Sequence, residues 1–148
     1  MLRALCVLMA MDLASAEDTV GMLEQIVRSA LESTDVTIFL YHDMICVSAY
    51  SPRQITDECF ENAAIFTTLA NWQIFYGHFT LNKNYGVLSC DSSNVIESVL
   101  PSEDEVLMLV YMPVKDMDVF GEDITKVCTE GANPYDAFET CQALLEVE

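Results

Sequence analysis

The stretch that decides the fold lies between residues 56 and 90 and reads TDECFENAAIFTTLANWQIFYGHFTLNKNYGVLSC. Thr56 is a good N-cap, and the two acidic residues after it complement the positive end of a helix dipole. We expect a helix from there to about Phe75, with Gly77 as its stop. Its apolar residues form one stripe with a second row beside it: Ile65, Leu69, Trp72 and Phe75, then Ala63, Phe66 and Ala70.

Two β-hairpins are expected, one on each side of this helix. After it, residues 78–81 and 87–90 read as strands, and the loop 82–86 contains asparagines and a glycine, which tolerate the positive φ values of a tight turn. Before it, residues 36–41 are β-branched and aromatic, and residues 45–50 alternate in character as a strand does. Hairpins without βαβ crossovers indicate that the strands pair antiparallel, with helices packed on them.

The two ends of the chain are predicted to be helical. Residues 20–31 carry apolar side chains at helical spacing, which is typical of an amphipathic helix. In the last third, Ser102 and Glu105 have the spacing of a capping box, and Pro113 should kink or end the helix that they begin. Gly131 is its expected cap, and Pro134 opens a final helix.

This order of elements predicts an α+β domain, in which helices pack on an antiparallel sheet built from two hairpins. No repeat or linker divides the chain, so residues 1–148 are expected to form one domain. Residues 1–16 allow two interpretations. They resemble a weak signal peptide, with Ala14-Ser15-Ala16 as the cleavage site, but Asp12 interrupts a short apolar run. The alternative is an extension docked on the domain.

Charge is the most informative feature of the composition. The chain has 24 acidic and six basic residues, a formal net charge of −18, and 52% hydrophobic residues. Such a surface repels phosphate backbones and anionic membranes, so neither nucleic acid nor membrane is an expected partner. It would attract proteins with basic or apolar binding segments. The simpler interpretation is that the acidity keeps an apolar-rich protein in solution.

The six cysteines show no paired spacing, which gives no support to a zinc site or a dithiol redox motif. We expect reduced and mostly buried thiols, as in a cytoplasmic protein, with secretion as the alternative. Asp116 and Asp118 have the spacing that begins a calcium loop, but Phe120 and Val127 stand where oxygen ligands are needed. No metal and no cofactor are therefore expected.

The sequence contains no recognisable catalytic motif. His42 and His78 are the only histidines, and no nucleophile motif accompanies either of them. The chain is therefore expected not to be an enzyme. A small hydrolase or ligand-binding enzyme that uses carboxylates with His42 or His78 remains the alternative, and it requires a deep site around one of these histidines.

The aromatic residues Trp72, Phe75 and Tyr76 close the central helix and are the candidate partner-binding residues. If they are exposed, they form an anchor of the kind that dominates protein interfaces. If they are buried, they mark the place where the helix packs on the sheet, which is the simpler expectation for Trp72 and Phe75.

The element order resembles the type III secretion chaperone-like fold and, within it, the YbjN-type bacterial family. The resemblance rests on LANW at residues 69–72, which leads into YGHFTLN at residues 76–82 and then into a second strand. It covers residues 19–130. The family has three strands before the central helix where two are evident here, and the late proline and the last helix also depart from its pattern.

The resemblance implies a small acidic cytoplasmic homodimer that binds unfolded or extended segments of partner proteins without a cofactor. Together with the charge and the missing catalytic motifs, it leads us to expect a non-enzymatic protein-binding domain, chaperone-like or regulatory. Such a domain would act through an acidic surface and an apolar, aromatic patch.

Overall fold

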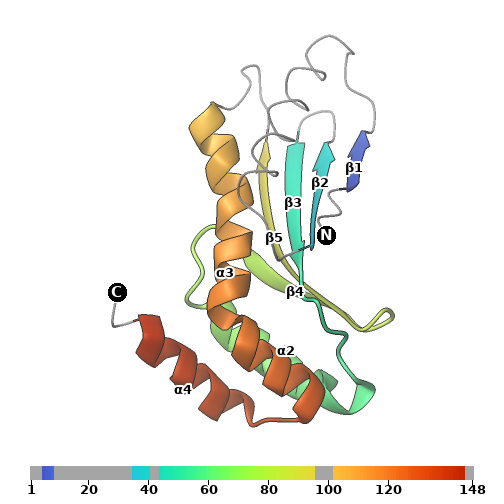
Figure 1. The fold of residues 1–148 in the computed structure, drawn as a ribbon, viewed down its shortest axis with the longest axis vertical. Coiled ribbons are helices and arrows are strands. Elements are labelled where there is room, and N and C mark those ends of the chain that lie inside the picture. Colours follow the sequence, from blue (N-terminus) through green and yellow to red (C-terminus); the bar gives the residue numbers. More distant parts are fainter. Residues whose placement is uncertain (1–4, 9–34, 41–43, 96–101, 146–148) are drawn as a thin grey trace.

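The computed structural model describes residues 5–8, 35–40, 44–95 and 102–145. The elements follow the order β1 (Leu5–Leu8), β2 (Asp35–Leu40), β3 (Met44–Tyr50), a 3-10 turn η1 (Asp57–Cys59), α2 (Phe60–Asn71), β4 (His78–Asn82), β5 (Val87–Val95), α3 (Glu103–Glu130) and α4 (Pro134–Leu145). Helices pack on one face of a sheet, which confirms the predicted α+β class (Figure 1). The predicted amphipathic helix at residues 20–31 lies outside the described residues.

The sheet has the strand order β1-β2-β3-β5-β4. β2 with β3, β3 with β5 and β5 with β4 pair antiparallel, and the first and last of these pairs are the two predicted hairpins. β1 instead pairs in parallel with β2, from Leu5 opposite Thr37 to Leu8 opposite Leu40. The sheet is therefore not wholly antiparallel, because an N-terminal segment with no strand prediction adds to its edge. β5 runs to Val95, beyond the predicted end at residue 90, because β3 pairs with it along its whole length.

The side chains of β3 alternate regularly between the covered and the open face of the sheet. Ile45, Val47 and Ala49 are buried, and the residues between them are only partly buried. α3 lies along this covered face over β3 and β5 (Figure 1). The first half of α3 closes one apolar cluster with β2 and β3, made of Val36, Ile38, Ile45, Val47, Ala49, Val106, Val110 and Val114.

A second apolar cluster joins α2, the C-terminal half of α3, α4 and the hairpin β4–β5. Its centre is a group of phenylalanines in edge-to-face contact. The ring of Phe66 lies 6.2 Å from that of Phe120 and 6.3 Å from that of Phe138, and Phe120 lies 5.7 Å from Phe79. Such pairs add to the hydrophobic gain from burial, so this group anchors three helices on the sheet.

α3 continues through Pro113 to the predicted cap at Gly131, so the proline does not end the helix. Proline has no N–H, and the carbonyl of Leu109, four residues earlier, loses its helical donor. The hydroxyl of Ser92 on β5 replaces that donor and donates to the Leu109 oxygen over 2.6 Å. Ser92 is 4% exposed, and Leu109 is partly buried. This hydrogen bond from the sheet therefore allows α3 to continue past the proline and to contribute to both apolar clusters.

This compensation can be tested by a double-mutant cycle. Ser92→Ala should lower the free energy of unfolding by about 1–3 kcal/mol, because the partly buried Leu109 carbonyl then has no donor from the protein. In the Pro113→Ala background the same change should cost much less, because the substituted alanine would supply the missing N–H. Urea unfolding of the four proteins measures the coupling.

The neighbouring Ser93→Ala is the matched control, because Ser93 is exposed on the other face of β5. It should change the free energy of unfolding by less than about 0.5 kcal/mol. Equal costs of Ser92→Ala with and without the proline would contradict the proposed compensation.

Candidate partner-binding site

The side chain of Asn71 fixes the end of α2 and the start of β4. Its Nδ2 donates to the backbone oxygen of Phe79 over 3.1 Å, and its Oδ1 accepts from the backbone N–H of Phe79 over 2.6 Å. Gly77 completes the connection, since a Cβ there would lie 2.9 Å from the backbone oxygen of Asp91. The turn between Asn71 and β4 is thus held at both ends. The predicted continuation of the helix to Phe75 was wrong for this reason.

The turn presents three aromatic side chains to solvent. Trp72 is 85% exposed, Phe75 93% and Tyr76 65%, whereas Ile74 packs against the second apolar cluster. The expected packing of Trp72 and Phe75 on the sheet is therefore wrong. Once the helix ends at Asn71, these residues no longer share its buried face. The structure brings all three candidate binding residues together in one exposed turn.

The buried face of α2 also differs from the expected one. It carries Ala63, Phe66 and Ala70, which the sequence predicts beside the main stripe, together with Thr67. The expected stripe begins with Ile65, which is 37% exposed. Periodicity alone could not choose between two adjacent apolar rows on the same helix.

A hollow of about 380 Å³ opens next to Tyr76, between the end of β5 and the start of α3. It is lined by Tyr76, Ser92, Ser93, Asn94, Asp104, Glu105, Met108 and Leu109. Most of these residues come from two elements that the bond between Ser92 and Leu109 holds together. No pattern in the sequence indicated this site, because its parts are far apart in the chain.

The acidic side of the hollow is set by the start of α3. Ser102 and Glu105 form the predicted capping box, in which Glu105 accepts from the Ser102 N–H over 2.7 Å and from its hydroxyl over 2.8 Å. These bonds lower the pKa of Glu105, so the carboxylate stays ionised. Asp104 beside it is exposed. Two carboxylates therefore stand beside an apolar surface.

A second hollow of about 360 Å³ lies on the outer face of α2. It is lined by Ala64, Ile65, Thr68, Leu69 and Tyr135, and Tyr135 belongs to α4. None of these side chains is charged. On a chain with a net charge of −18, this is a surface where another acidic molecule could approach without direct repulsion.

The alternative of a hydrolase can be examined at His78, because His42 lies outside the described residues. His78 is exposed, and the strand register places it opposite Asp91, which lies opposite Ser48. Neighbouring strands are about 4.8 Å apart, so Ser48 and His78 are separated by roughly 10 Å. A histidine base must contact its serine directly. Asp91 therefore lies between Ser48 and His78, and the histidine does not reach the serine as a catalytic triad requires.

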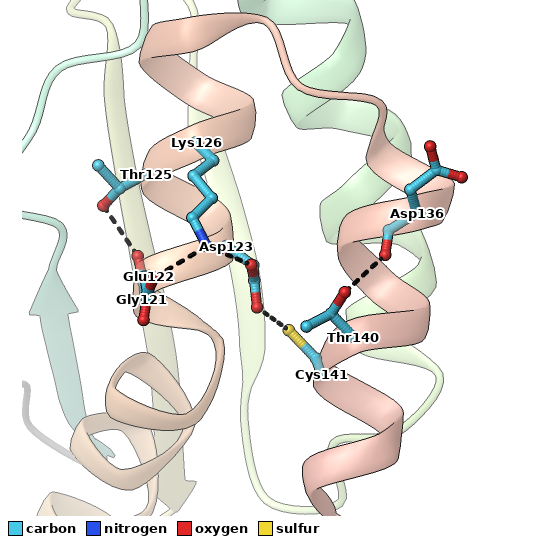
Figure 2. Close-up of polar contacts among 8 residues, drawn as sticks. All are labelled: Gly121, Glu122, Asp123, Thr125, Lys126, Asp136, Thr140 and Cys141. Carbon is cyan, nitrogen blue, oxygen red and sulfur yellow. Dashed lines mark hydrogen bonds and ion pairs between the residues drawn. The ribbon is translucent and has the colours of Figure 1, made fainter.

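A group of polar side chains joins α3 to α4 (Figure 2). Asp123 is 7% exposed; its Oδ1 accepts from Lys126 Nζ over 3.2 Å, and its Oδ2 accepts from Cys141 Sγ over 3.2 Å. Lys126 also pairs with Glu122 at 2.8 Å. These contacts satisfy a buried carboxylate and dock α4, so we assign the group a structural role.

The five cysteines whose side chains are described are free, and all except Cys46 are buried. Burial is the main cause that raises the pKa of Cys128 and of Cys141 to about 12, and it also raises the pKa of Cys90. A reactive cysteine needs a thiolate, so these three thiols are inert at neutral pH.

The aspartates of the rejected calcium loop lie within α3, where the chain is helical and forms no loop. One of them, Asp116, has a buried Oδ2 without a hydrogen-bond partner among the described residues. Burial raises the pKa of Asp116 from its ordinary 3.8 to about 6, and the charge of Lys115 opposes this shift. Among the described residues, no three His, Cys, Asp or Glu side chains gather to hold a metal ion.

Asp116 gives a pH dependence whose sign can be checked. Because its pKa is higher in the folded chain than in the unfolded one, its contribution makes the fold less stable as pH rises from about 4 to about 6. Asp116→Asn should therefore raise the free energy of unfolding at pH 7.5 by roughly 1–2 kcal/mol, allowing for partial exposure. The gain should fall to a few tenths near pH 4.

Urea unfolding at both pH values measures this difference. Asp118→Asn makes the same charge change at an exposed position on the same helix and serves as the control. Equal gains from the two variants would show that relief of general acidity, and not burial of Asp116, is responsible.

No known protein-family model matches the chain, and no curated protein sequence is significantly similar to it. Within the described part of the chain, no helix has the length and apolar character needed to cross a membrane.

Proposed function

We propose that this chain is a non-enzymatic protein-binding domain, chaperone-like or regulatory, that holds partner segments through the aromatic turn at residues 72–76. The observation that carries the proposal is the exposure of Trp72 and Phe75, at 85% and 93%, in a turn fixed by Asn71. Aromatic side chains on a rigid support supply contact area at low entropic cost. Ile74 of the same turn packs against the second apolar cluster, whereas these two aromatic side chains do not.

The acidic surface supports the same proposal. A net charge of −18 would accelerate the approach of basic segments and disfavour acidic competitors. The cytoplasm is the proposed compartment, in keeping with the expectation of reduced thiols. Membership of the YbjN-type family, or of the wider type III secretion chaperone-like group, is proposed on the element order and on the LANW and YGHFTLN stretches at residues 69–72 and 76–82.

Removal of the aromatic anchor should abolish partner binding. In a pull-down from native extract analysed by mass spectrometry, the Trp72→Ser/Phe75→Ser double variant should lose the partners that the unchanged chain enriches. Hot-spot side chains contribute about 2 kcal/mol or more each, so affinity for a captured partner should fall by more than about 30-fold.

Tyr85→Ser is the matched control for this experiment. Tyr85 is an aromatic residue, 72% exposed, in the turn between β4 and β5. Its replacement should leave partner capture unchanged. Partners that are lost equally with Tyr85→Ser, or retained by the double variant, would count against the aromatic turn as the binding surface.

We further propose that the chain forms a homodimer through the uncharged hollow on α2. Two copies with a net charge of −18 repel each other over most of their surfaces, and the described residues that line the hollow with Ile65 and Leu69 include no carboxylate. A two-fold axis through this face would place the same apolar stripe on both partners, as an isologous interface requires.

Light scattering should then give twice the chain mass of 16.5 kDa. Ile65→Glu should shift the mass to that of one chain, because it would bury two unpaired carboxylates at the two-fold contact. The control is Leu107→Glu on α3, at a similar exposure of 42%, which should leave the dimer intact. A monomer for the unchanged chain would refute this part of the proposal, with no consequence for the aromatic turn.

A further inference from the structure

The hollow beside Tyr76 combines an apolar interior with an acidic rim. Met108 and Leu109 supply apolar surface from α3, and the ring of Tyr76 stands beside them. Asp104 and Glu105 belong to the preceding turn of the same helix. A volume of about 380 Å³ lies within the range of roughly 300–1,000 Å³ that small-molecule sites occupy. The space therefore suits one bulky side chain better than a whole folded surface.

Among the described residues that line this hollow, none is basic and able to neutralise its rim. Two of the lysines in the described part of the chain are engaged elsewhere. Lys126 is bound to Glu122 and Asp123, and Lys83 lies 5.2 Å from the centre of the Phe60 ring. The field at the rim is thus negative, and it is strengthened by the net charge of the whole chain.

From these observations we infer that the hollow receives one bulky apolar side chain, leucine or phenylalanine, from a peptide segment of a partner protein whose neighbouring residues are lysine or arginine. The apolar side chain would lie against Met108, Leu109 and Tyr76. The basic neighbours would face Asp104 and Glu105. This inference rests on the proposed protein-binding function and specifies the chemistry of the segment that is bound.

Charge complementarity favours a basic peptide segment over a second copy of the chain in this hollow. A second copy of the chain would bring its own acidic surface against Asp104 and Glu105, and repulsion would oppose the contact. Glu105 suits the recognition of a cation because the capping box already fixes its carboxylate, so little side-chain entropy is lost on binding.

Three fluorescein-labelled peptides test the inference by fluorescence anisotropy with the full chain. The peptide KKLFKK carries both features, KKSSKK carries only the charge, and EELFEE carries only the apolar pair. At about 0.15 M salt, where charges are screened beyond about 8 Å, KKLFKK should bind at least about tenfold more tightly than either of the others. Equal affinities for KKLFKK and KKSSKK would overturn the inference.

Two variants of adjacent residues separate the hollow from the general charge. Met108→Asp and Leu107→Asp add the same negative charge at side chains with exposures of 43% and 42%, but only Met108 lines the hollow. Met108→Asp should weaken KKLFKK binding by at least about tenfold, whereas Leu107→Asp should keep it within about twofold. Affinities that rise equally in both variants, as attraction to net charge alone predicts, would overturn the inference.

Asp104→Asn provides a further test that does not disturb the apolar lining. It should weaken KKLFKK binding a few-fold and reduce its dependence on salt, and no change in either would count against the role of the rim. The inference can fail while the proposed function stands. In that case, the Trp72→Ser/Phe75→Ser variant still loses its partners, but Met108→Asp retains both those partners and its peptide affinities.

Discussion

The hydrogen bond from Ser92 to the carbonyl of Leu109 is the contact on which the rest of the structure depends. α3 contributes to both apolar clusters, and it can do so only because it continues past Pro113. Without a donor from β5, the proline would leave the partly buried carbonyl of Leu109 unsatisfied within the helix. The same bond holds the start of α3 against the end of β5, and the hollow beside Tyr76 lies between these two elements.

The two hollows differ in their electrostatic surroundings, and the partners proposed for them differ for this reason. The described lining of the hollow on α2 includes no charged side chain, whereas that of the hollow at the start of α3 includes two carboxylates. On a strongly acidic chain, contact with an identical molecule is less unfavourable at the first hollow than at the second. One chain could therefore pair with itself and bind a basic segment without competition between the two contacts.

Local patterns in the sequence predicted most of the elements but few of the contacts between them. The capping box at Ser102, the two hairpins and the final helix at Pro134 depend on neighbouring residues, and they were confirmed. The fate of Pro113 depends on Ser92, which lies 21 positions earlier on a strand. Similarly, the end of α2 is set by the bond between Asn71 and Phe79. No periodicity or propensity contains such tertiary hydrogen bonds.

Asn71 also explains why the aromatic turn can stay exposed without endangering the fold. β4 is an edge strand, and the unpaired groups of such a strand can join the strand of another molecule. The amide of Asn71 occupies both backbone groups of Phe79, so a strand that approached this edge would have to displace it. Aromatic residues next to an open strand edge would promote aggregation. At Phe79, where Asn71 covers the edge, strand addition is opposed, and the aromatic residues stay available for side-chain contacts.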